Sequence, residues 1–195
     1  MIVLASRSVV RVKLMRDAGV TFEADAADLD EDALVEGISD PAVQAVTLAR
    51  AKGLHVAKRY PGRFVVGGDQ VGVNDDDSTL LKPLDPEHHV TLLMSMSGRT
   101  HRFFPAAALV KDASVIASVV DDVAVTFWNF SESVARQYVA TGEGVGSCGG
   151  YESENRGAQL IERVQGSLQA VLGFPLLLVL PMLRKHCALE AGLLR

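Results

Sequence analysis

The sequence is poor in cysteine, in excess positive charge and in long apolar runs, and each shortage excludes a class of protein. Two cysteines among 195 residues are too few for a disulfide-stapled scaffold. A formal net charge of -5 provides no overall positive field to hold a nucleic-acid polymer or an anionic membrane. The most apolar stretch, residues 171–183, contains Pro175 and Pro181 and is shorter than the roughly 20 residues that cross a bilayer.

The remaining composition is that of a folded, water-exposed chain. Hydrophobic residues make up 48% and charged residues 22%, which is enough to bury one core. No repeat or long linker divides the sequence, so we expect a single domain over residues 1–195. The first residues contain no basic region followed by an apolar h-region, and we therefore expect a cytoplasmic location.

Hydrophobic periodicity predicts strands that both alternate with helices and pair as hairpins. The expected strands span residues 2–5, 63–73, 100–110, 115–130 and 159–164, and the expected helices span residues 9–19, 41–60, 87–96, 131–140 and 176–189. A polar turn at residues 74–78 is expected to form a hairpin, and a glycine-dense loop follows residue 140. This order predicts an α/β fold in which a mixed sheet carries helices on its faces.

Two serines and an arginine follow the first strand, where a helix is expected to begin. The N-terminus of a helix offers unpaired N–H groups and a partial positive charge, and Ser6 and Ser8 add hydroxyl donors. The guanidinium of Arg11 has a fork of donors suited to phosphate. We predict a phosphate-binding corner here. The alternative is that Ser8 only caps the helix while Arg11 extends its side chain towards water.

A lysine and an aspartate occupy positions where most sequences place apolar residues. Lys52 continues the apolar helical stripe of Ala45 and Ala49, where an ammonium needs a carboxylate or a ligand phosphate as partner. The alternative is a lysine at the edge of that stripe with its ammonium in water. Asp69 ends an apolar run after two glycines, which would let a ligand or metal approach the backbone. It is a candidate base or metal ligand; the alternative is an aspartate that starts a turn.

Two weaker candidates are Lys82 and Glu31. Lys82 follows a short apolar segment and precedes Pro83, which restricts the chain beyond it. Glu31 lies in an acidic run whose oxygens could help to hold a divalent cation. Either residue could instead be an ordinary solvated side chain.

Two other patterns are set aside. Residues 144–149 match the G-x-G-x-x-G spacing of dinucleotide-binding proteins, but they follow an expected helix and not a strand. Cys148 could be paired on paper with any of the histidines, yet no spacing supports a nucleophile pair or a zinc site. We expect Cys148 to be a small buried thiol.

Taken together, the segments resemble the Maf family, which is similar to nucleoside triphosphate pyrophosphatases. The resemblance covers nearly the whole chain and rests on these motifs in order: LASRSVVR, LARAK, VVGGDQV, LLKP, SGRTH, GSCGGYESE and LGFPLL. Gln70 after Asp69, together with Ser153-Glu154, is similar to the branch that acts on 7-methyl-GTP. The branch that acts on dTTP and UTP has threonine and glutamine at those two places.

The resemblance implies a two-lobed fold around a nucleotide cleft, similar to inosine triphosphate pyrophosphatase, and a role for each matching residue. Asp69 matches the proton acceptor, and Glu31 matches an acidic position near a Mg²⁺ or Mn²⁺ ion that Asp69 would also contact. The phosphate contacts fall on Ser6, Ser8, Arg11, Lys52 and Lys82, and the base-preference positions on Val10, Gln70 and Glu154. A homodimer is also implied.

The sequence departs from the family pattern near its start. The usual S-P-x-R-R segment reads Ser8-Val9-Val10-Arg11-Val12, so a proline and an arginine are missing, and Val10 cannot stack on a base or pair with it. Three activities stay open: hydrolysis of 7-methyl-GTP or a related nucleotide to the monophosphate and pyrophosphate, broad hydrolysis of modified nucleotides, or a nucleotide-binding regulator related to cell division with little turnover.

Overall fold

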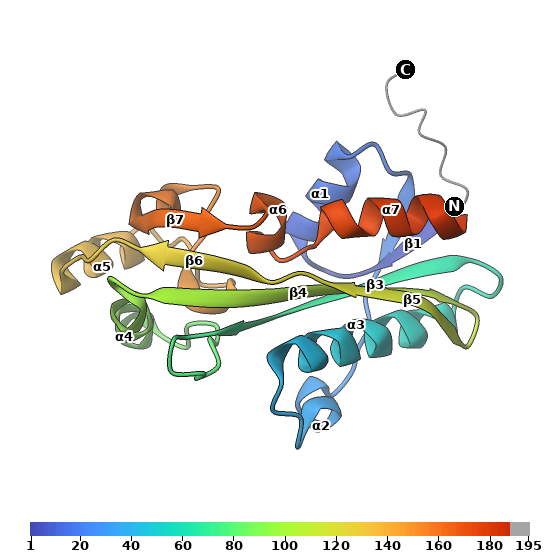
Figure 1. Cartoon of the computed structure of the whole chain (residues 1–195), viewed down its shortest axis with the longest axis horizontal. Helices are drawn as coiled ribbons and strands as arrows, with labels where there is room; N and C mark the ends of the chain where they lie inside the picture. The colour runs from blue at the N-terminus through green and yellow to red at the C-terminus, as the bar shows by residue number, and fades with distance from the viewer. Residues whose placement is uncertain (188–195) are drawn as a thin grey trace. The chain divides into compact units, whose positions relative to one another are not determined.

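The computed structural model describes residues 1–187, and Figure 1 shows how their strands and helices are arranged. The elements in chain order are β1 (Ile2–Ala5), α1 (Val9–Asp17), β2 (Phe22–Asp25), α2 (Glu31–Val35), α3 (Pro41–Ala57), β3 (Phe64–Val73), α4 (Pro86–Met96), β4 (Thr100–Lys111), β5 (Ser114–Val120), β6 (Val123–Phe127), α5 (Glu132–Val139), the 3₁₀ turns η1 (Cys148–Gly150) and η2 (Arg156–Leu160), β7 (Ile161–Gln165), α6 (Leu168–Val171) and α7 (Leu176–Cys187).

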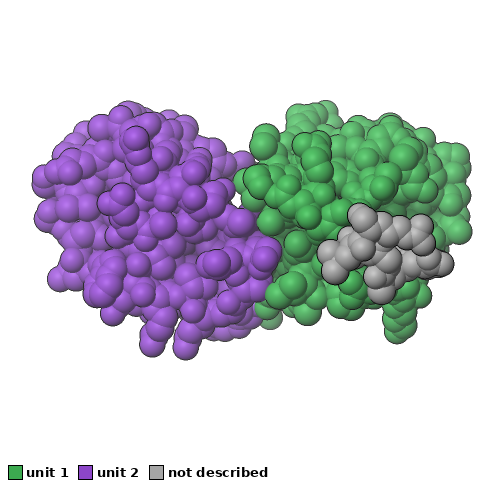
Figure 2. Space-filling view, turned by 90° about the horizontal axis from the view of Figure 1, so that it is seen from above, with its two compact units in different colours: residues 1–70, 104–121, 173–195 green, residues 71–103, 122–172 purple. Residues whose placement is uncertain are grey.

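The chain packs into two compact units, coloured separately in Figure 2. Among the described residues, unit 1 contains residues 1–70, 104–121 and 173–187, and unit 2 contains residues 71–103 and 122–172. Strands β3 and β4 each begin in one unit and end in the other. The single domain expected over residues 1–195 stays a prediction.

Unit 1 is a layered α/β structure. Strand β1 pairs in parallel with β2 and β3, and β4 pairs antiparallel with β5 in a register that joins Ala106 to Val120. Helices α1 and α7 cover one face of these strands and α3 covers the other, as Figure 1 shows. Leu4 is buried towards α7, whereas the neighbouring Val3 is buried against α3. The predicted mixed sheet with helices on its faces is confirmed.

Unit 2 is built on antiparallel pairing. The first residues of β4 pair with β6, and β6 pairs with β7. An apolar cluster lies among these strands and helices α4 and α5, and it includes the fully or almost fully buried rings of Phe103, Phe127 and Tyr151. The 3₁₀ turn η1 belongs to this unit, where the amide of Gly149 donates to the carbonyl of Leu81 at 3.1 Å.

Helix α3 packs unusually close to β3, and glycines make that approach possible. Asp40 caps α3 by accepting from the amides of Ala42 and Val43, and Pro41 stands at its first position, as the sequence predicts. A Cβ atom on Gly67 would come within 2.0 Å of the carbonyl oxygen of Ala49.

The two glycines before Asp69 therefore serve packing inside the protein. Gly67 faces α3, and a Cβ on Gly68 would meet the ring of Phe174 at 3.2 Å. Our expectation that Gly67 and Gly68 open the backbone to a ligand is wrong in this respect, because protein atoms already take up that space.

Several boundaries differ from the sequence prediction. The strand expected over residues 115–130 is two strands, β5 and β6, which pair with different parts of β4. The hairpin expected around residues 74–78 is reduced to one bridge between Val73 and Thr79. Five short elements were not predicted: β2, α2, α6 and the 3₁₀ turns η1 and η2. The last helix was predicted to residue 189; it runs from Leu176 to Cys187, and residues 188 and 189 lie outside the described part. Within residues 1–187, no helix is long and apolar enough to cross a membrane.

Candidate active site

The ammonium of Lys52 lies between two carboxylates in unit 1. Its Nζ is 2.5 Å from Oδ1 of Asp69 and 2.8 Å from Oε2 of Glu31. The side chains of Lys52 and Asp69 are 14% and 10% exposed, whereas that of Glu31 is 48% exposed. The partner predicted for Lys52 is thus a carboxylate, and the alternative of an ammonium free in water is wrong.

Three elements bring these side chains together. Lys52 stands on the face of α3 that also buries Ala45 and Ala49, so its side chain leaves the helix towards the sheet. Asp69 follows the close contact between β3 and α3 at Gly67. Glu31 is the first residue of α2, a short helix capped by Asp30, and not part of an irregular acidic loop as expected.

Arg11 joins helix α1 to two distant backbone segments of unit 1. Its Nε donates to the carbonyl of Gly173 at 2.9 Å, and its Nη1 donates to the carbonyl of Gly68 at 2.8 Å. Burial lowers the pKa of the Arg11 guanidinium, while the charges of Asp69 and Glu31 oppose that shift. A guanidinium has five N–H donors, so these two bonds leave further donors for an anionic ligand.

The serines before α1 use their side-chain oxygens on the backbone. Ser6 Oγ accepts from the amide of Ser8 at 3.1 Å, and Ser8 Oγ accepts from the amide of Arg11 at 3.3 Å. Ser8 is therefore a helix cap, and both hydroxyl hydrogens remain able to donate. A phosphate role for Ser6 and Ser8 stays a prediction.

The residues predicted to set base preference are divided between the two units. Val10 is half-buried on α1, and Gln70 is half-buried at the end of unit 1, where its Oε1 lies 2.7 Å from the position of a Cβ on Gly173. Glu154 is exposed and belongs to unit 2. The roles of all three stay predictions.

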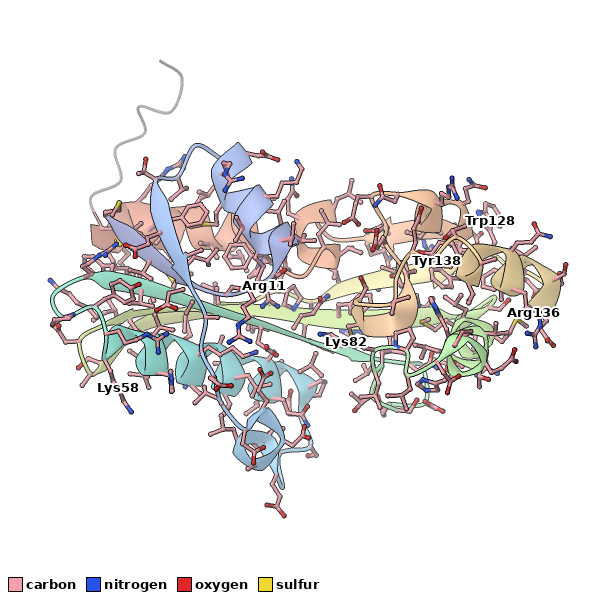
Figure 3. All side chains as sticks on the ribbon, turned by 180° about the vertical axis from the view of Figure 1, so that it is seen from behind. Arg11, Lys58, Lys82, Trp128, Arg136 and Tyr138 are labelled. Carbon is pink, nitrogen blue, oxygen red and sulfur yellow. The ribbon has the colours of Figure 1, made fainter. Side chains whose placement is uncertain are left out.

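Lys82 also belongs to unit 2, and Figure 3 labels it together with Arg11. It is exposed, and the segment before it is held in place by the glycine-dense loop. The carbonyl of Leu80 accepts from Cys148 Sγ at 3.0 Å, and the carbonyl of Leu81 accepts from the amide of Gly149. Cys148 is half-buried, so our expectation of a small buried thiol is only partly correct.

Sequence reasoning missed Gly173 as a part of this site. Its backbone has a positive φ of 96°, and its carbonyl accepts from Arg11. The only signal was a glycine before Phe174-Pro175, which indicates a turn but not what that turn contacts.

The donor atoms suit a divalent cation that is shared with a ligand. Carboxylate oxygens are hard donors, and Mg²⁺ is commonly held by one or two carboxylates together with substrate phosphates. Among the residues that the structure describes, no three or more His, Cys, Asp or Glu side chains are grouped so that they could hold a metal ion. Glu31 and Asp69 thus fit a metal ion whose remaining ligands are phosphate oxygens and water.

Comparison with known proteins identifies relatives over nearly the full length. The sequence profile described as Maf-like protein matches residues 1–186. A protein of Rhizobium johnstonii named 7-methyl-GTP pyrophosphatase is 36% identical, over 97% of this chain and 98% of its own length. A nucleoside triphosphate pyrophosphatase of Nitrobacter hamburgensis is 38% identical, over 95% of this chain and 93% of its own. Among solved structures, a HAM1 protein from Coxiella burnetii is similar with a TM-score of 0.44 and 19% identity, over 63% of this chain and 69% of that one.

Proposed function

Since this chain belongs to the Maf family, as the match over residues 1–186 shows, we propose that it is a nucleoside triphosphate pyrophosphatase. It is a hydrolase that cleaves the bond between the α- and β-phosphates and releases a nucleoside monophosphate and pyrophosphate. Near full-length relatives with this activity in their names support the proposal. The structural observation that carries it is the buried Asp69, paired with Lys52 and within the electrostatic range of Arg11.

The cations of unit 1 would bind the triphosphate. Lys52 and Arg11 stabilise negative charge that builds up on the leaving pyrophosphate, because fixed donors in a partly water-excluded site need little rearrangement. The hydroxyls of Ser6 and Ser8 donate to phosphate oxygens at the start of α1. Lys82 is proposed as a further phosphate contact on the family resemblance alone.

Asp69 would act on the attacking water. Its Oδ1 faces Lys52 in this structure, so we assign to Oδ2 the role of orienting the water and accepting its proton. The water oxygen then forms the new bond to phosphorus, and the electron pair of the broken bond leaves with pyrophosphate. Glu31 and Asp69, together with the phosphates, would hold a Mg²⁺ or Mn²⁺ ion, which would supply positive charge at the phosphate oxygens.

We propose 7-methyl-GTP or a related modified nucleotide as the substrate. The edge of a guanine presents N–H groups that can donate hydrogen bonds to the carboxylate of Glu154. The negative charge of this carboxylate also favours a positively charged, 7-methylated ring. Gln70 adds hydrogen-bonding capacity, whereas Val10 offers the base only an apolar contact. The homodimer and the cytoplasmic location stay predictions.

The test measures pyrophosphate release from 7-methyl-GTP, GTP, dTTP and UTP with Mg²⁺. We expect the wild type to favour 7-methyl-GTP, and the Asp69→Asn variant to lose on the order of 10²-fold or more in kcat, the range typical of a lost general base. Comparable turnover by the variant would remove Asp69 from this role. Tight nucleotide binding without any product would favour the nucleotide-binding regulator, and an even profile would favour a broad pyrophosphatase.

A further inference from the structure

We propose that the Lys52 ammonium keeps divalent cations away from Glu31 and Asp69 in the nucleotide-free protein. A metal ion then reaches these carboxylates only together with a nucleotide, whose phosphates compete for the ammonium. The inference rests on the proposed function and adds to it the order in which the metal and the nucleotide bind.

The geometry sets the ammonium and a metal ion in direct competition. Lys52 Nζ contacts both carboxylates, Asp69 at 2.5 Å and Glu31 at 2.8 Å, so a cation bound to the same oxygens would lie beside a positive charge. Because Lys52 and Asp69 are largely buried, water screens that repulsion only weakly. The ammonium therefore has to exchange its partners before both carboxylates can bind a divalent ion.

The charge balance of the cluster gives the same result. Arg11 and Lys52 together carry two positive charges, which balance the two negative charges of the carboxylates that Lys52 contacts. Arg11 belongs to this cluster because both carboxylates influence its pKa. A cluster with no net charge attracts a divalent cation weakly. A triphosphate adds several negative charges at once, which offers Lys52 a new partner and makes metal binding favourable.

The experiment measures Mn²⁺ binding to the full chain without nucleotide, by calorimetry and by the electron paramagnetic resonance signal of free Mn²⁺. Lys52→Met removes the ammonium but keeps a long side chain. The matched control is Lys58→Met, because Lys58 is an exposed lysine at the end of the same helix and Figure 3 shows it pointing away from the ribbon. We expect Lys52→Met to bind Mn²⁺ at least tenfold more tightly than the wild type, and Lys58→Met to match the wild type.

Further variants locate the metal ion and guard against misfolding. Adding Glu31→Gln or Asp69→Asn to Lys52→Met should abolish the gain, because each removes one of the two carboxylate ligands. Lys52→Gln, which keeps a hydrogen-bond donor without the charge, should show an intermediate gain. Far-UV circular dichroism tests whether each variant is folded. If Lys52→Met does not fold, the Mn²⁺ affinity of Lys52→Gln decides whether the ammonium excludes the cation.

A non-hydrolysable nucleotide tests the second half of the inference. With guanosine 5′-(α,β-methylene)triphosphate present, we expect Mn²⁺ affinity to rise more than tenfold in the wild type and less in Lys52→Met. Equal Mn²⁺ affinity of the wild type and Lys52→Met without nucleotide would overturn the inference. A different outcome would overturn only the proposed function. If the wild type releases no pyrophosphate from any nucleotide but Lys52→Met still binds Mn²⁺ more tightly, the cation exclusion stands.

Discussion

Position 52 places a charged group on the buried face of a helix, where an unpaired ammonium would be costly. Lys52 is tolerated there because two carboxylates contact its ammonium, and Asp69 is tolerated inside the sheet because Lys52 contacts it in turn. Removing one charged side chain from a buried ion pair leaves the other charge buried and uncompensated. The pairing therefore makes Lys52 and Asp69 dependent on each other for folding as well as for the proposed chemistry.

His101 shows the opposite solution to the burial of a titratable group. Its ring is fully buried against Phe103 and Phe127, and Nε2 shares a hydrogen bond of 2.8 Å with the hydroxyl of Tyr151. Within the described residues its Nδ1 has no hydrogen-bond partner. Burial lowers the pKa of His101 from 6.5 to about 3, so the ring stays neutral in the folded protein at physiological pH.

This lowered pKa predicts a specific loss of stability in acid. Below pH 6.5 the unfolded chain protonates position 101 and the folded chain does not, so stability falls as the pH drops from 6.5 towards 3. His101 should contribute about 2 kcal/mol of the loss between pH 7.5 and pH 5. Urea unfolding at these two pH values measures it, with His101→Gln expected to lose about 2 kcal/mol less than the wild type over the same interval.

His55→Gln is the control for that measurement, since His55 is only half-buried in α3. If His101→Gln and His55→Gln lose the same stability between the two pH values, His101 is not the source of the acid sensitivity.

At the scale of elements, the glycine-dense loop after α5 is held by close backbone contacts. Gly144 has a φ of +80°, and a Cβ atom there would lie 2.2 Å from the carbonyl oxygen of Gly150. Gly150 in turn accepts a hydrogen bond of 2.5 Å from His89 Nε2 on α4. Gly144, the first glycine of the G-x-G-x-x-G pattern, thus allows the loop to fold on itself, which agrees with our rejection of a dinucleotide fingerprint.

Two matched substitutions in this loop separate packing from backbone strain. Gly142 has nearly the same φ of +77°, but nothing lies within 4 Å of the position of its Cβ. Gly142→Ala should therefore cost only the left-handed strain of about 1 kcal/mol. Gly144→Ala should lower the free energy of unfolding by roughly 2 kcal/mol more, since backbone must move. Thermal and urea unfolding measure the difference, and equal stability of the two variants would refute the close contact at Gly144.

Prediction from the sequence worked best for elements with strong local signals. The caps Ser8 and Asp40 and the proline at position 41 mark the starts of α1 and α3. The short β2 and α2 were missed because none of their side chains is buried, and hence they have no hydrophobic period to detect. The break between β5 and β6 was missed although Asp121 and Asp122 interrupt the apolar run there, because only the pairing of the two strands with different residues of β4 shows that they are separate.

At the scale of the whole molecule, the two units share strands. Because β3 and β4 each supply residues to both units, losing either strand removes core from both. We predict that the chain unfolds in one cooperative transition. The only tryptophan, Trp128, lies in unit 2 and is 53% exposed, so its fluorescence follows that unit, whereas far-UV circular dichroism follows both.

The two signals should give the same midpoint in urea, within error. Distinct midpoints would show that the units unfold separately, and would contradict the single domain expected for the chain.

The sequence by itself determined the class of fold and the identity of the candidate residues. Alternating apolar runs, helix caps and a lysine inside an apolar stripe are local patterns, which neighbouring residues define. Only the tertiary structure decided the partners: that Lys52 binds both Asp69 and Glu31, that Arg11 binds the carbonyls of Gly68 and Gly173, and that the close approach at Gly67 is made by a helix. These contacts join segments far apart along the chain, and their distances depend on how strands and helices pack, which no local pattern specifies.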